Sequence, residues 1–137
     1  YSFYLQNGHL HYAQNVVSAA LLEVRSVVPV PAGRHSLRFA FEPTGPADIK
    51  AGKGVPGRGQ LYVDGHPVGQ ADFAATVPIT YGLGGGVVCG ADPGSPVTPA
   101  YVPPFAFTGV LEEVTVEVSG APIPDGAAEL RQILSRQ

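Results

Sequence analysis

The chain has 137 residues, of which 45% are hydrophobic and only 14% charged, and its formal net charge is −3. This composition fits one domain with a real core, and it excludes both disorder and the concentrated basic face that nucleic-acid binding needs. No apolar run approaches the roughly 20 residues of a membrane-spanning helix, so no membrane contact is expected. The 18 Gly and 14 Pro residues favour many short strands joined by turns.

In chain order, the first strong signals are two hairpin turns. Asn7-Gly8 and Asp64-Gly65 each lie between runs in which apolar and polar residues alternate. A type I′ turn needs positive φ at both central residues, which these residue pairs tolerate. The predicted hairpin strands are Ser2–Gln6 with His9–Gln14, and Gly59–Asp64 with His66–Asp72.

Further strands are expected between and after the hairpins, at Ala19–Val28, Arg34–Glu42, Ala74–Tyr81, Gly85–Gly90 and Phe105–Val118. Residues 43–59 contain five Gly and three Pro and predict a long exposed loop, and residues 91–104 predict another. Beyond Pro124 the pattern changes. Asp125 can cap a helix from about Gly126 to Ser135, in which Leu130, Ile133 and Leu134 recur at helical spacing.

Strands at this spacing predict an all-β fold, an antiparallel β-sandwich of the jelly-roll or concanavalin A and laminin G-like type, with a short C-terminal helix. The sandwich domain is expected to span residues 1–120, and residues 121–137 to form its helical tail. Two sheets about 10 Å apart would share one core. The residues expected in that core are Phe3, Leu5, Leu37, Phe39, Phe41, Leu61, Val63, Val114 and Val116.

Some residues could carry metal or thiol chemistry. His9 and His11 share one strand face and could bind zinc with Asp64 or Asp72, although surface histidines on a sheet are ordinary. Cys89, the single cysteine, lies in an apolar run and is expected to be a buried structural thiol. A chain without paired cysteines favours a reducing compartment such as the cytoplasm.

The tyrosines offer a binding hypothesis. Tyr4, Tyr12, Tyr62 and Tyr101 could form a sugar-stacking platform if they were exposed together on one concave face. The same side chains could equally fill the rim of the core or face another domain. Both alternatives stay open on the sequence alone.

An ordered series of motifs covers about residues 1–120. These are Tyr1-Ser-Phe-Tyr-Leu-Gln-Asn-Gly-His-Leu-His-Tyr12, Val30-Pro-Ala-Gly-Arg-His-Ser-Leu-Arg-Phe39, Gly59-Gln-Leu-Tyr-Val-Asp-Gly65, Pro96-Val-Thr-Pro-Ala-Tyr101 and Pro104-Phe-Ala-Phe-Thr-Gly109. The series resembles the C-terminal domain of long bacterial arylsulfatases of the actinobacterial, mycobacterial type. The resemblance implies a parent enzyme that hydrolyses sulfate esters with a formylglycine nucleophile beside calcium.

The family's catalytic signature, Cys or Ser-x-Pro-x-Arg, is not present here. Cys89-Gly-Ala-Asp-Pro93 has neither the Pro nor the Arg in place. The resemblance therefore places the formylglycine, the calcium ligands and every catalytic residue in an N-terminal sulfatase domain outside this chain. The sequence contains no Met and opens on Tyr1 inside a predicted strand, which is typical of part of a longer protein.

By this resemblance the chain is expected to be a non-catalytic accessory domain that packs on its own N-terminal sulfatase domain. The stripe of Leu130, Ile133 and Leu134 would cover an interdomain seam or pair subunits in a homo-oligomer. The main alternative is a carbohydrate-binding module attached to an enzyme. An enzyme in its own right would need a pocket where His and carboxylate side chains converge.

Overall fold

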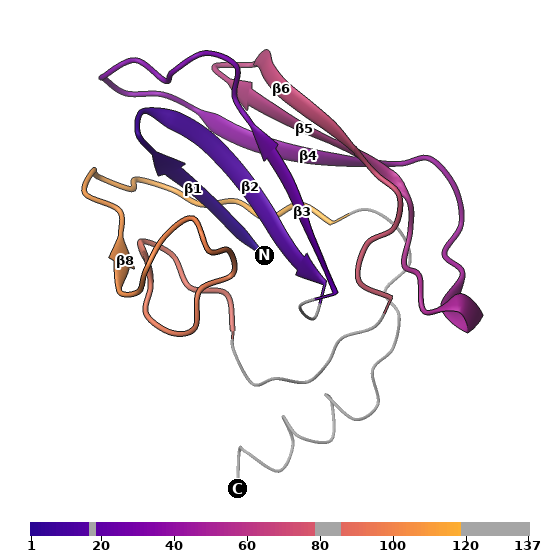
Figure 1. The fold of residues 1–137 in the computed structure, drawn as a ribbon. Coiled ribbons are helices and arrows are strands. Elements are labelled where there is room, and N and C mark those ends of the chain that lie inside the picture. Colours follow the sequence, from indigo (N-terminus) through magenta and orange to yellow (C-terminus); the bar gives the residue numbers. More distant parts are fainter. Residues whose placement is uncertain (17–18, 79–85, 119–137) are drawn as a thin grey trace, which may run out of the picture.

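The computed structural model describes residues 1–16, 19–78 and 86–118, and this part of the chain is all-β with antiparallel pairing (Figure 1). Sheet A has the strand order β1-β2-β3, and sheet B has the order β4-β5-β6. β7 and β8 form a two-stranded ribbon. The strand bounds are β1 (Ser2–Gln6), β2 (His9–Val16), β3 (Ala20–Arg25), β4 (Leu37–Pro43), β5 (Gly57–Val63), β6 (His66–Phe73), β7 (Ala91–Asp92) and β8 (Phe105–Ala106).

Both predicted hairpins are confirmed. Asn7 and Gly8 have φ of 50° and 76°, and Asp64 and Gly65 have φ of 51° and 80°, the positive values that a type I′ turn requires. These turns fix the register of β1 with β2 and of β5 with β6. The predicted loop between β4 and β5 is also present, and it contains one 3₁₀ turn at Ile49–Ala51.

The two sheets share one core, and Figure 1 shows them lying one against the other. Leu10 and Val24 from sheet A and Leu61 and Phe73 from sheet B are its buried residues. The ring of Tyr12 on β2 stacks on Phe39 of β4 with 3.6 Å between the ring centroids. Most of the predicted core residues of the two sheets are found here, with Leu61 buried and Leu5, Leu37, Phe39, Phe41 and Val63 partly buried around it.

At one side the sheets touch through their backbones. The Val27 amide, just after β3, donates to the Val68 carbonyl of β6 over 2.8 Å. Gly69 follows, and a Cβ built on it would lie 3.0 Å from the carbonyl carbon of Arg25 and 3.2 Å from the Cα of Ser26. Only glycine fits here without displacing β3, so the lack of a side chain at Gly69 allows β3 and β6 to come this close.

The late strands of the prediction are wrong within the described residues. From the predicted strand Phe105–Val118 only Phe105–Ala106 is paired, and residues 74–78 and 86–90 are not in strands. Val114 and Val116 are therefore 52% and 64% exposed rather than core residues. An alternating pattern becomes a strand only where a partner edge is available.

Two further core assignments are corrected. Phe3 is 41% exposed, because β1 is the edge strand of sheet A and its inner face is open on that side. Cys89 is an exposed thiol rather than a buried one. It stands in an unpaired stretch whose neighbours Val87 and Val88 are also exposed.

The outer face of sheet A is covered by residues 91–106, which fold back over it. Tyr4, Ala13 and Tyr101 are buried there, and Val97 and Phe105 pack against them. The side-chain Nε2 of Gln6 donates to the Ala100 carbonyl over 2.7 Å and anchors this cover. The predicted C-terminal helix, with Leu130, Ile133 and Leu134, lies outside the described residues.

No helix among the residues described above is both long enough and apolar enough to cross a membrane.

Candidate functional site

Within the part of the chain that the structure describes, nothing covers the outer face of sheet B, and we call it the open face. Strand alternation and the register of β4, β5 and β6 place polar side chains here in three neighbouring rows. Arg38, Glu42, Arg58, Gln70 and Asp72 are exposed, and Ala40, Gln60 and Tyr62 are half-buried. The rows are Arg38, Tyr62 and Pro67; then Ala40, Gln60 and Gln70; then Glu42, Arg58 and Asp72.

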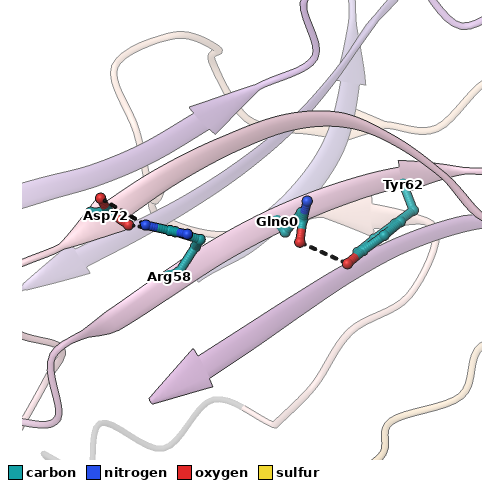
Figure 2. A network of polar contacts seen from close by, with 4 residues as sticks. All are labelled: Arg58, Gln60, Tyr62 and Asp72. Carbon is teal, nitrogen blue, oxygen red and sulfur yellow. Dashed lines mark hydrogen bonds and ion pairs between the residues drawn. The ribbon is translucent and has the colours of Figure 1, made fainter. Parts of the chain in front are cut away.

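The first row is held by an aromatic contact. The guanidinium carbon of Arg38 lies 4.0 Å from the centroid of the Tyr62 ring, close enough for a cation–π interaction. The Tyr62 hydroxyl donates to Oε1 of Gln60 over 2.8 Å, as Figure 2 shows. Arg38, Tyr62 and Gln60 are thus fixed in place by one another, at the outer surface of the sheet.

The third row ends in an ion pair. Nε of Arg58 lies 2.8 Å from Oδ1 of Asp72, and the two side chains face each other from β5 and β6 (Figure 2). The hydrogen bond from Arg58 lowers the pKa of the Asp72 carboxyl. Both side chains are exposed, so the pair adds little to stability. Its effect is to hold a carboxylate and a guanidinium in a fixed relative position.

A hollow of about 380 Å³ lies beside this ion pair. Arg58 and Asp72 form its polar side, and Pro56, Phe73 and Ala74 form an apolar side. Thr44 and Gly57 complete the lining, so the hollow opens where β4, β5 and β6 end or begin. The candidate site is this hollow together with the three rows of the open face.

The charges of the open face balance. Arg38 and Arg58 carry positive charge, and Glu42 and Asp72 carry negative charge, so the formal sum of the four is zero. A face with no net charge gives no long-range attraction to a strongly anionic or cationic partner.

The structure does not bring the four predicted tyrosines onto one exposed face. Tyr4 and Tyr101 lie together beneath the cover of sheet A, 8% and 4% exposed, with their ring centroids 5.1 Å apart. The Tyr101 hydroxyl donates to Asp92 over 2.6 Å, and burial raises the pKa of Tyr101. Burial between the sheets raises the pKa of Tyr12 to about 12. Tyr62 is the member of the set that stands on the open face.

The histidines and acids of the zinc hypothesis are also apart. His9 Nδ1 lies 2.9 Å from the Ser26 carbonyl, and the His11 ring stacks on Tyr4, where burial lowers the His11 pKa. Asp64 and Asp72 belong to the other sheet and its turn. Among the residues described, no three His, Cys, Asp or Glu side chains come together in a group that could hold a metal ion.

Asp64 has a structural task in its turn. Its carboxylate accepts hydrogen bonds from the Ser36 amide over 2.9 Å and pairs with His35 Nδ1 over 2.7 Å. The His35 contact and the Ser36 amide lower the pKa of the Asp64 carboxyl. Nε2 of His35 is buried without a hydrogen-bond partner in the described structure. This corner ties the β5–β6 turn to the start of β4.

A second surface feature is the apolar segment that follows β8. Its large side chains are exposed and none of residues 107–118 is in a strand. Glu112 forms an ion pair with Arg34, which fixes one point of the segment near the start of β4. We call residues 107–118 the apolar segment; its exposed members are Phe107, Val110, Leu111, Val114, Val116 and Val118.

Sequence reasoning missed the open face as a unit. Arg38 and Ala40 are readable as outward positions of their strand, and Tyr62 follows from alternation in the second hairpin. What the sequence does not contain is the order of the strands, which sets Arg38 beside Tyr62 and Arg58 beside Asp72.

Comparison with protein-family models, with curated proteins and with solved structures finds no match to this chain.

Proposed function

We propose that this chain is a non-catalytic accessory domain that docks on a larger polypeptide, namely the catalytic domain of an arylsulfatase-like enzyme. The observation that carries the proposal is the apolar segment. Val110 and Val118 are 86% and 91% exposed, and four more large apolar side chains accompany them. Exposed large apolar side chains that gather in one segment are typical of protein interaction sites.

The energy available to such a contact is considerable. Full burial of one Val or Leu side chain is worth about 1.5–3 kcal/mol. Several such residues in one segment offset the entropy lost on association more readily than scattered surface residues do.

The sequence of the segment also suits a docked strand. Val114, Val116 and Val118 alternate with Thr115 and Glu117, so an extended backbone would present the three valines to one side. In the proposed complex these valines face the catalytic domain, and Thr115 and Glu117 face water.

The identity of the partner rests on the ordered motifs that resemble the C-terminal domain of long arylsulfatases. In this proposal the fold is a jelly-roll or laminin G-like variant of the sandwich. The catalytic domain supplies the formylglycine and the calcium site, and the present chain supports its surface.

The proposal is tested by polar replacement of the valines. Val114→Thr, Val116→Thr and Val118→Thr, combined in one chain, keep the side-chain shapes but remove apolar surface. We expect association with the separately produced catalytic domain of the parent protein to weaken at least tenfold. The melting temperature of the isolated chain should stay unchanged, because these positions are exposed.

The matched control replaces the alternate positions, with Thr115→Ser and Glu117→Gln in one chain. This control is expected to associate as the wild type does. A wild-type chain that does not associate with the catalytic domain, or a triple variant that associates equally well, would overturn the proposal.

A further inference from the structure

We propose that the open face of sheet B, together with the hollow beside Arg58 and Asp72, binds a neutral oligosaccharide. This inference concerns a different surface from the apolar segment and does not depend on the docking role. It starts from the difference between the two sheets. The outer face of sheet A is covered by residues 91–106, while the outer face of sheet B presents exposed Arg38, Gln70 and Asp72.

The side chains of the open face are held in place before any ligand arrives. Tyr62 is fixed by its hydrogen bond to Gln60 and by the guanidinium of Arg38, and Asp72 is fixed by Arg58. Fixed side chains lose less conformational entropy on binding, so each hydrogen bond to a ligand contributes more.

The chemistry of the face matches a sugar. A sugar ring carries neighbouring hydroxyls that both donate and accept hydrogen bonds, and it has an apolar C–H face. Carboxylate, guanidinium and amide side chains such as Asp72, Arg58 and Gln70 offer two adjacent acceptors or donors to such hydroxyl pairs. Tyr62 combines an aromatic body with a polar hydroxyl, as suits a ligand that is partly apolar and partly wet.

The charge balance selects the ligand class. Arg38 and Arg58 are offset by Glu42 and Asp72, so a strongly anionic or cationic chain would meet equal attraction and repulsion along the face. An uncharged polyhydroxylated chain meets neither, and it can use all four groups as hydrogen-bond partners.

The geometry indicates how the chain would lie. The hollow of about 380 Å³ beside Arg58 and Asp72 would receive one end of the chain, with Pro56 and Ala74 on its apolar side. From there the rows lead past Gln60 toward Tyr62. Ala40, the shortest side chain of the middle row, leaves space between the longer Arg38 and Glu42 on β4.

The test is affinity electrophoresis of the chain through native gels that contain dextran, mannan or galactan, three neutral polysaccharides. We expect at least one of them to retard the wild type. Tyr62→Ala and Gln70→Ala should weaken that retardation at least fivefold, and Tyr62→Phe, which keeps the ring but loses the bond to Gln60, should have an intermediate effect. Gln70 is exposed, so its variant remains folded and informative even if Tyr62→Ala is unstable.

Two matched controls lie away from the open face. Tyr1→Ala removes an exposed aromatic ring next to sheet A, and Glu113→Gln removes an exposed charge from the apolar segment. Both should be retarded as the wild type is, and so should the triple Val→Thr chain. The absence of retardation by all three polysaccharides, or retardation that survives both Tyr62→Ala and Gln70→Ala, would overturn the inference while leaving the docking proposal standing.

Discussion

Gly69→Ala is a sharp test of how the two sheets pack, because the structure predicts its sign. Where a strand has room for a side chain, replacing Gly by Ala stabilises the fold by roughly 0.5–1 kcal/mol, because the unfolded chain has less conformational entropy to lose. At Gly69 the new methyl group would overlap the Arg25 carbonyl oxygen, and it would lie 3.0 Å from the Arg25 carbonyl carbon and 3.2 Å from the Cα of Ser26. Backbone atoms cannot rotate away as a side-chain end can, so β3 and β6 must separate.

The cost follows from the contacts that this separation disturbs. Overpacking of a well-packed contact costs about 1–3 kcal/mol. Strain on the adjacent bond from the Val27 amide to the Val68 carbonyl adds up to about 1 kcal/mol. After subtraction of the entropic gain, we expect a net loss of about 1–3 kcal/mol, or roughly 3–10 °C in melting temperature for a chain of this size.

The assay is thermal and urea unfolding of Gly69→Ala beside Gly94→Ala, followed by circular dichroism. Gly94 has no heavy atom within 4 Å of a built Cβ, so its replacement should be neutral or slightly stabilising. A Gly69→Ala chain as stable as the wild type, or more stable, would refute the close approach of β3 to β6.

Three further predictions follow from the core and from the titrating groups. Leu61→Ala, at a fully buried position, should destabilise the chain by about 2–5 kcal/mol in urea unfolding, and a loss below 1 kcal/mol would contradict the shared core. Tyr12 should titrate at a pKa of about 12 in an ultraviolet titration. Because this folded pKa is raised, the stability of the chain should fall as the pH rises from 10 toward 12. A Tyr12→Phe chain that loses the same stability at alkaline pH would argue against the burial of Tyr12. The pKa of Asp64 should lie below its ordinary 3.8 in a carbon-detected NMR titration. The contribution of Asp64 to stability is therefore present at neutral pH and is lost as the pH falls through the folded pKa. Asp64→Asn should lower the melting temperature more at pH 7 than at pH 2, and an equal effect at both pH values would count against the His35 contact.

The first half of the fold could be predicted from the sequence because its signals are local. Asn7-Gly8 and Asp64-Gly65 determine their own turns and the register of the strands on each side. The alternation of Leu37, Phe39 and Phe41 likewise identifies the core face of β4 before any partner is known.

The second half could not be predicted in the same way, because its structure depends on what lies beside it. Val114, Val116 and Val118 have the alternation of a buried strand, yet no strand among the described residues pairs with them and they are exposed. Conversely, Tyr101 is buried from within a Pro-rich stretch that has no strand period, because residues 91–106 fold over β1 and β2. Neither outcome could be predicted from the neighbouring residues in the sequence alone.

The candidate site, too, could be predicted from the sequence only in part. Sequence alternation finds that Arg38 and Tyr62 point outward, but the order β4-β5-β6 is what makes them neighbours 4.0 Å apart. The four tyrosines looked equivalent in the sequence, and the structure separates Tyr62 on the open face from Tyr4 and Tyr101 under the cover.

The central proposal is that the chain assists a sulfatase and does not itself carry out catalysis. The most direct test is aryl sulfate hydrolysis, with calcium present, by this chain alone and by the natural full-length protein, each as the wild type and as the triple Val→Thr variant. The account predicts activity in the full-length protein, less of it when the three valines are replaced, and none in the isolated chain. Hydrolysis by the isolated chain, or no hydrolysis by the full-length protein, would contradict it.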